Sequence, residues 1–118
     1  MKATYNLEKR LIEFSIKAIQ FIEKLCKSPS NKHLGNQLLR STTSAALNYG
    51  EAQSAESRKD FIHKCKIVLK ELRESAICLQ IIQGSNNHLG GLDLILNETN
   101  ELISIFMKCV QTAQKNNK

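Results

Sequence analysis

Three glutamates are the side chains of this sequence best suited to general acid–base catalysis. They are Glu51, Glu71 and Glu74. Such chemistry needs a partner group, yet no histidine or nucleophile stands at a recognisable spacing from them, and no glycine-rich phosphate loop follows a strand. Paired metal-binding carboxylates in a helical bundle normally occur as Glu-x-x-His, whereas Glu71 is followed three residues later by Glu74. We therefore expect no catalytic residue and no enzyme activity.

Cysteines and histidines are the next groups that could bind a metal or undergo redox chemistry. The cysteines are Cys26, Cys65, Cys78 and Cys109, and the histidines are His33, His63 and His88. No two cysteines form a Cys-x-x-Cys pair, which argues against a zinc ribbon or a thioredoxin motif. Each cysteine falls on or beside an apolar helix face, so we expect reduced, buried thiols in a cytosolic protein. The sequence predicts neither a metal site nor a cofactor.

Basic side chains recur at helical spacing in the region expected to form the third helix. The row consists of Lys59, His63, Lys66, Lys70 and Arg73, with Arg58 adding to its start. Lysines and arginines aligned in this way can follow a phosphate backbone, with an affinity that falls as the salt concentration rises. A solvated helix face has the same pattern, and this interpretation stays open. No aromatic residues alternate with the charges, so stacking on single-stranded bases is not indicated.

The formal net charge of +6 is unevenly distributed along the chain. Residues 1–40 hold eight Lys or Arg against three acids, and residues 57–84 hold six against three. The first of these regions has a second basic line that we expect to face solvent: Arg10, Lys17, Lys24 and Lys27. We assign Lys17 and Lys24 to the candidate nucleic-acid surface, together with the row on the third helix. A basic surplus of this kind indicates a polyanion or an acidic protein surface as the partner.

A polar stripe marks the second expected helix. Its members are four and three residues apart and so share one face: Gln37, Ser41, Ser44, Asn48 and Glu51. We expect these side chains to bond across to the third helix or to a neighbouring subunit, and Arg40 to bond Glu71 or Glu74. A buried polar group without a partner costs ~1–3 kcal/mol, so we place this structural network ahead of ligand binding. Such a network would fix the register of the helices more than it adds stability.

Hydrophobic periodicity predicts an all-α fold, an antiparallel up-down-up-down four-helix bundle that forms one domain over residues 1–118. The expected helices span residues 7–27, 31–52, 57–83 and 92–114. Asn6 can cap the first helix and Ser57 the third, and the dipeptide Ser28-Pro29 separates the first two. The glycines before the last helix suit a helix C-cap and a flexible connection.

Two apolar lines run along the first expected helix. One follows a bundle seam through Leu7, Leu11, Phe14, Ala18, Phe21 and Leu25. The third helix has an equivalent seam that begins at Phe61. The second line of the first helix consists of Ile12, Ile16, Ile19 and Ile22. A deeply buried helix in a thick bundle would explain this wide face, but we favour packing of the second line on another subunit, as an oligomer interface.

The sequence lacks the features that direct a protein into or across a membrane. Its first residues, MKATYNLEKR, have no apolar segment followed by a cleavage site. No apolar run approaches the ~20 residues that a membrane span requires. We therefore expect a cytoplasmic protein without membrane contact.

The segment NQLLRSTTSAALNYGEA, followed by SRKDF and KELRES, resembles the 23S rRNA intervening-sequence proteins, a family of four-helix bundles. The resemblance extends from about Leu34 to Leu79 and is fairly specific, because it joins uncommon polar positions on two helices. It departs from the family pattern at Ala45, Ala46 and Tyr49, which bear on packing more than on chemistry. The resemblance implies an up-down bundle, a ring-like homo-pentamer, a nucleic-acid role and no catalytic activity. More distantly, the chain resembles the accessory protein of diversity-generating retroelements, a basic pentamer that works with a reverse transcriptase on RNA.

Two functional hypotheses follow. The first is a non-enzymatic, homo-oligomeric helical adaptor that binds RNA or DNA through its basic faces. The second is a protein–protein scaffold, assembled through the apolar face of the first helix and the polar stripe of the second, for which nucleic acid is irrelevant.

Overall fold

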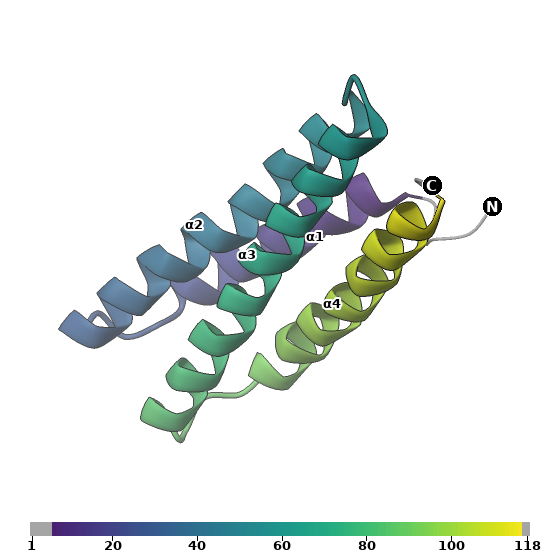
Figure 1. Ribbon diagram of the computed structural model, residues 1–118. Coiled ribbons are helices and arrows are strands. Elements are labelled where there is room, and N and C mark those ends of the chain that lie inside the picture. Colours follow the sequence, from purple (N-terminus) through teal and green to yellow (C-terminus); the bar gives the residue numbers. More distant parts are fainter. Residues whose placement is uncertain (1–5, 117–118) are drawn as a thin grey trace.

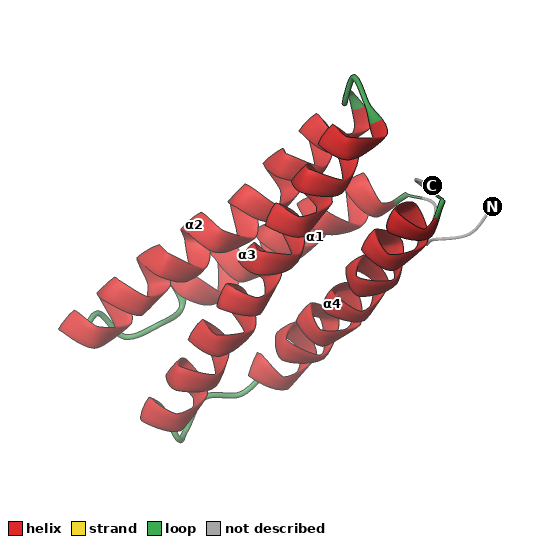
Figure 2. Ribbon diagram, viewed as in Figure 1, coloured by secondary structure: helices red, strands yellow, loops and turns green. Residues whose placement is uncertain are grey.

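The protein is predominantly helical over the residues that the computed structural model describes, 6–116. They form α1 (Leu7–Glu23), α2 (Pro29–Gln53), α3 (Arg58–Ser85) and α4 (Leu92–Lys115), joined by short connections (Figure 1). Figure 2 shows helices and loops, and no strand, in this part of the chain. The predicted all-α fold class is therefore confirmed. None of these helices combines the length and the apolar character that crossing a membrane requires.

The four helices pack into an elongated bundle with dimensions of 49 × 27 × 19 Å. The chain reverses direction at each connection, and α3 packs between α2 and α4 (Figure 1). The α2–α3 interface is the most extensive and the α1–α4 interface the smallest, and the backbones of α1 and α3 are not close neighbours. This is the predicted up-down-up-down arrangement.

The core is built from the predicted seams. Every helix contributes fully buried side chains, among them Leu11, Leu38, Leu72 and Leu102. Burying a leucine contributes roughly 1.5–3 kcal/mol, so these rows hold the bundle together. Phe61, an expected seam residue, is only partly buried, and Ile62 is buried in its place. Phe61 instead lines an open hollow beside the last turns of α4. Cys109, expected to be a buried thiol, is also only partly buried.

The end of α1 lies before its predicted position. The helix stops at Glu23 instead of Lys27, because the chain tightens ahead of the proline that follows. The N–H groups of Lys24 and Leu25 donate to the carbonyls three residues back, each at 3.1 Å. Cys26, predicted to be a buried thiol, is consequently exposed in the connection.

The start of α2 also differs from the prediction. It begins at Pro29 instead of Asn31, because the fixed φ and missing N–H of proline are well tolerated in the first turn of a helix. Ser28 caps the helix by accepting a hydrogen bond from the Asn31 N–H at 3.2 Å. The remaining helix ends fall within two residues of their predicted positions.

Both predicted N-caps are confirmed. The side chain of Asn6 accepts a hydrogen bond from the Lys9 N–H at 3.2 Å. The hydroxyl of Ser57 accepts one from the Asp60 N–H at 3.0 Å. Each cap satisfies a backbone donor that the first helical turn leaves unpaired.

The predicted glycine C-cap of α3 is wrong. The helix continues through Gly84, and its C-cap is Asn86, with φ −137°. The glycine that matters in this connection is Gly91, which precedes α4 with φ +79°. This left-handed conformation strains any residue with a Cβ, so Gly91 sets the direction in which α4 leaves the connection.

Two asparagines join the connections at one end of the bundle. Asn31 and Asn86 exchange side-chain hydrogen bonds of 3.1 and 3.0 Å. Asn31 also donates to the carbonyl of Cys26 at 2.9 Å. Because Asn31 is only 5% exposed, this amide pair is part of the interior.

Candidate nucleic-acid interface

Six side chains form a continuous exposed row on α3, which we call the basic ridge: Arg58, Lys59, His63, Lys66, Lys70 and Arg73. The ridge is exposed because the opposite face of the same helix holds the buried seam of Cys65, Val68 and Leu72. From Lys59 to Arg73 it extends about 21 Å, at the helical rise of 1.5 Å per residue. This helix therefore presents five of the predicted residues on one face, with Arg58 beside them at its start.

The cations of the basic ridge have no acidic partner within the described residues. The salt bridges found there involve Arg10, Arg40 and Lys64. Each of these three cations lies outside the ridge. Lysines and arginines without a direct ion pair keep much of their positive potential. Within the described residues, the charge of the ridge is therefore available to an anionic ligand.

A shallow hollow of about 340 Å³ lies within the ridge, lined by Lys66, Leu69, Lys70 and Arg73. Their spacing places three cations on consecutive turns around one half-buried leucine. An anion in this hollow can meet several cations at once, which an isolated surface lysine does not allow. Leu69 was not among the predicted site residues, although it stands at helical spacing from Lys66 and Arg73.

The two α1 lysines assigned to the same surface lie elsewhere. Lys17 and Lys24 are exposed and line a separate hollow of about 220 Å³ with the start of α4, including Leu94. Because this hollow is shared with α4 and contains no residue of α3, one protomer does not unite these lysines with the basic ridge. Spacing within a helix predicts which residues share a face, but it does not predict which helices are neighbours.

The prediction that Arg10 faces solvent is wrong, because this residue joins α1 to α4. Its guanidinium donates hydrogen bonds of 2.8 and 3.0 Å to Glu98 and a further one to Glu101. The Arg10 side chain is only 19% exposed. The hydrogen bond to Glu98 raises the pKa of Arg10 above its ordinary value, so the guanidinium stays charged. Nothing in the sequence of α1 reveals this acidic pair on α4.

Two members of the polar stripe bond across to α3. The hydroxyls of Ser41 and Ser75 share a 2.7 Å hydrogen bond in the core. Ser75 also donates to the carbonyl of Glu71 at 2.9 Å. Near the other end of α2, Glu51 accepts a hydrogen bond from the Lys64 ammonium at 2.6 Å. These contacts fix the register of α2 against α3 at two separate levels.

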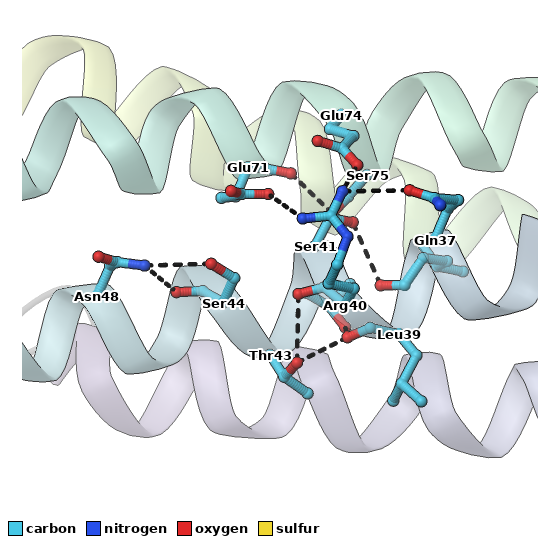
Figure 3. Close-up of polar contacts among 12 residues, drawn as sticks. Gln37, Leu39, Arg40, Ser41, Thr43, Ser44, Asn48, Glu71, Glu74 and Ser75 are labelled. Atoms are coloured by element: carbon cyan, nitrogen blue, oxygen red, sulfur yellow. Dashed lines mark hydrogen bonds and ion pairs between the residues drawn. The ribbon is translucent and has the colours of Figure 1, made fainter.

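The other three stripe members bond within α2 (Figure 3). The Asn48 amide donates to the carbonyl and hydroxyl of Ser44 at 2.9 and 3.1 Å. Gln37 accepts a hydrogen bond from Arg40 at 3.1 Å. For these three residues, bonding across to α3 is therefore not found. Their bonding to a neighbouring subunit stays a prediction.

Arg40 connects α2 to two glutamates of α3, as Figure 3 shows. Its guanidinium forms an ion pair with Glu74, and its Nη1 lies 3.9 Å from Oε1 of Glu71. The Glu71 side chain is 8% exposed, and within the described residues its Oε1 has no hydrogen-bond partner. Arg40 therefore supplies positive charge to a carboxylate that water scarcely reaches, and it holds α2 and α3 together at this point.

An apolar strip remains exposed on the side of α1 and α2, formed by Ile12 and Ile16 of α1 with Leu39 of α2. These side chains are 46%, 47% and 39% exposed. Leu39 extends from α2 on the side facing α1 (Figure 3). Of the other two predicted interface residues, Ile19 is half-buried, and Ile22 is half-buried against α2 within the protomer.

Comparison with known proteins places this arrangement in a family. The family model described as "23S rRNA-intervening sequence protein" matches residues 4–109. Among solved structures, the chain is similar to a protein with unknown function from the S23 ribosomal protein family of Bacteroides thetaiotaomicron, at 27% identity and a TM-score of 0.79. That match covers 87% of this chain and 96% of the other. A comparison with curated proteins finds no match. The predicted family is confirmed, and the chain belongs to the 23S rRNA-intervening sequence proteins.

Proposed function

We propose that this protein is a non-enzymatic, homo-oligomeric adaptor that binds RNA or DNA through the basic ridge of α3. The observation that supports this most is the row of exposed cations without acidic partners among the described residues. The hollow lined by Lys66, Lys70 and Arg73 lies at the C-terminal end of this row. Affinity would come from phosphate contacts and the release of counterions, so we expect little dependence on base sequence.

Assembly would extend this surface. The resemblance noted from the sequence implies a pentamer, in which a formal charge of +6 per protomer is repeated around a ring. The exposed apolar strip on α1 and α2 offers the self-association surface. Because Lys17 and Lys24 lie away from the ridge in one protomer, they would join it only through a neighbouring protomer. We place this assembly in a bacterial cytoplasm.

The nucleic acid that suits this ridge is a duplex. Proteins that bind single strands without sequence preference stack bases on exposed aromatic rings. No aromatic residue occurs within the basic ridge, and the one aromatic pair among the described residues, Tyr49 with Phe106, has its rings 5.3 Å apart in an edge-to-face contact. A straight cationic helix face instead suits the regular phosphate rows of a double helix.

The test is binding of the purified protein to labelled RNA and DNA duplexes across a salt series. We compare the wild type with Lys66→Gln/Lys70→Gln/Arg73→Gln. Losing three phosphate contacts should weaken binding at low salt and reduce the slope of log affinity against log salt by roughly 2–3.

The matched control is Lys9→Gln/Lys32→Gln/Lys115→Gln, which removes the same formal charge from exposed residues outside the ridge. It should keep most of the affinity. Equal losses of affinity in the two triple variants would mean that binding depends on the overall positive charge and not on the ridge. An absence of binding by the folded wild type at low salt would exclude the proposal.

The alternative function is a protein–protein scaffold, which the apolar strip favours. Under this alternative, partner binding responds to Ile12→Ser/Ile16→Ser and is indifferent to the three substitutions in the ridge. Ile22 is a poor test residue because it is half-buried against α2 in the same protomer. Its substitution would disturb folding and binding together.

A further inference from the structure

A hollow of about 440 Å³ lies between the first turn of α3 and the last turns of α4, and we call it the apolar hollow. The partly buried ring of Phe61 belongs to its wall, together with Ile105 and Ala113 of α4. Apolar atoms make up most of the surface that faces the hollow. Small-molecule sites in proteins have volumes of roughly 300–1,000 Å³, so the apolar hollow is large enough for a small organic ligand.

The walls of the apolar hollow come from two packed helices. On α4, Ile105, Cys109, Thr112 and Asn116 line it at spacings of four, three and four residues, so they share one helix face. On α3, the helix begins just before Phe61, and the Ser57 cap fixes that first turn. Because both walls belong to capped or packed helices, the hollow exists before any ligand arrives.

Two cations line the hollow from opposite helices. They are Arg58 of α3 and Lys108 of α4, and both are exposed. Neither takes part in the ion pairs found among the described residues. None of the described residues that line the hollow is acidic. An apolar surface beside two uncompensated cations is complementary to a molecule with an apolar body and an anionic group.

We propose that the apolar hollow binds amphiphilic carboxylates, small molecules that combine a hydrocarbon body with one carboxylate. The body lies against Phe61 and Ile105 and removes their apolar surface from water. The carboxylate lies beside Arg58 and Lys108, whose side chains donate charge-assisted hydrogen bonds to it. A cation finds no acidic partner there among the described residues, and a fully polar anion would leave the apolar wall in contact with water.

This inference goes beyond the proposed nucleic-acid function and does not depend on it. The two surfaces share one residue, Arg58, which begins the basic ridge and also lines the hollow. The tests therefore change Lys108 and leave Arg58 intact. The hollow within the ridge has three cations around Leu69 alone, an arrangement that suits a phosphate better than a hydrocarbon body.

The first experiment titrates the wild-type protein with three probes of equal chain length: decanoate, decanol and decyltrimethylammonium. Calorimetry measures the three affinities. We expect decanoate to bind about tenfold more tightly than decanol, because it adds charge-assisted contacts to the same apolar burial. The ammonium probe should bind most weakly. Equal affinities for the three probes, or tightest binding of the ammonium, would overturn the proposal.

Cys109 reports where decanoate binds, because it lines the hollow. Alkylation by iodoacetamide is followed by mass spectrometry, with the exposed Cys26 as the reference. At a decanoate concentration ten times its Kd, mass action leaves few hollows empty, so alkylation of Cys109 should slow about tenfold while that of Cys26 is unchanged. Equal slowing at both cysteines would place the ligand elsewhere. Slowing at Cys109 with rising protein concentration alone would mean that a second copy of the chain covers the hollow, which would also overturn the proposal.

A charge variant tests the carboxylate contact. Lys108→Gln should weaken decanoate binding roughly three- to tenfold and leave decanol binding unchanged, because only the carboxylate meets this cation. The matched control is Lys115→Gln, which removes an exposed lysine of the same helix outside the lining. Equal losses in the two variants would refute the assigned contact.

A filling variant tests the apolar contact. Thr112→Trp places a large ring in the hollow from an exposed position, and it should abolish binding of both decanoate and decanol. Gln111→Trp adds the same ring at an exposed neighbouring position outside the lining and should retain both affinities. Circular dichroism verifies the fold of each variant. Undiminished decanoate binding by folded Thr112→Trp would exclude the apolar hollow as the site.

Discussion

Single residues show how strongly the interior of this bundle depends on charge compensation. Glu71 is a carboxylate with 8% of its side chain exposed, and Arg40 lies above it with 55% exposed. The cation is therefore mostly solvated while the anion is mostly not. Solvent around Arg40 screens the ion pair and reduces its contribution to stability. Removing the cation, however, leaves the Glu71 carboxylate poorly hydrated and without a compensating charge. The energetic asymmetry makes Arg40 the more informative residue to change.

The substitution Arg40→Met keeps the aliphatic length and removes the charge. We expect the free energy of unfolding to fall by about 1–3 kcal/mol, because a buried carboxylate loses its partner. Urea denaturation measures this loss. In Arg40→Met/Glu71→Gln the buried charge is gone as well, so part of the stability should return. A double variant no more stable than Arg40→Met would contradict this account of Glu71.

At the scale of the element, α2 contains two glycines in different surroundings. A Cβ built at Gly35 would lie 3.1 Å from Cγ2 of Ile22, and one built at Gly50 would meet nothing within 4 Å. Glycine lowers the stability of a helix interior by roughly 1 kcal/mol relative to alanine. At Gly35 it also permits the close approach of α1. At Gly50 no contact with a neighbouring helix requires it.

The two alanine substitutions should therefore differ. Gly50→Ala is expected to raise the free energy of unfolding by about 0.5–1 kcal/mol through helix propensity alone. Gly35→Ala gains the same propensity but must displace Ile22, a crowding that costs roughly 1–3 kcal/mol in packed interiors. Thermal or urea unfolding compares them. A Gly35→Ala variant as stable as Gly50→Ala would mean that α1 moves aside freely.

Elements were largely predictable from the sequence because the seams repeat at helical spacing. Leu72 and Leu102 are buried as their positions required. The α1–α2 junction is harder to predict, because a proline can either break a helix or occupy its first turn, and Pro29 occupies the first turn of α2. Phe61 shows a related limit. Periodicity cannot reveal that the end of α4 leaves a hollow beside the first turn of α3.

At the scale of the whole molecule, the sequence predicts which residues of the site share a helix face, but not which helices lie side by side. The basic ridge follows from the exposure opposite the α3 seam, and all its members are exposed. The separation of Lys17 from the ridge and the pairing of Arg10 with Glu98 depend on which helices are neighbours. Spacing along one helix contains no information on that arrangement.

Assembly is the property of the whole molecule that the apolar strip predicts. Ile12→Ser/Ile16→Ser should lower the mass in solution at micromolar concentration, because the strip would no longer bury apolar area between protomers. Light scattering measures the mass, and an unchanged helical spectrum establishes that the variant is folded. Leu94→Ser, at a leucine 76% exposed on α4, is the control. An unchanged mass in the α1 variant, or an equal loss in the control, would contradict this role for the strip.

The amide pair between Asn31 and Asn86 gives the two ends of the bundle different dynamics. Each amide donates to the other, so the α1–α2 and α3–α4 connections cannot separate without stranding a buried polar group. At the opposite end, the α2–α3 turn is joined by the exposed ion pair of Glu51 with Lys64, and no buried amide pair of this kind is found there among the described residues. Local opening should therefore begin at that turn, and backbone amides there should exchange with solvent sooner than those beside Asn31. We therefore expect the helices to separate first at the α2–α3 turn, while the pair of Asn31 and Asn86 holds the other end together.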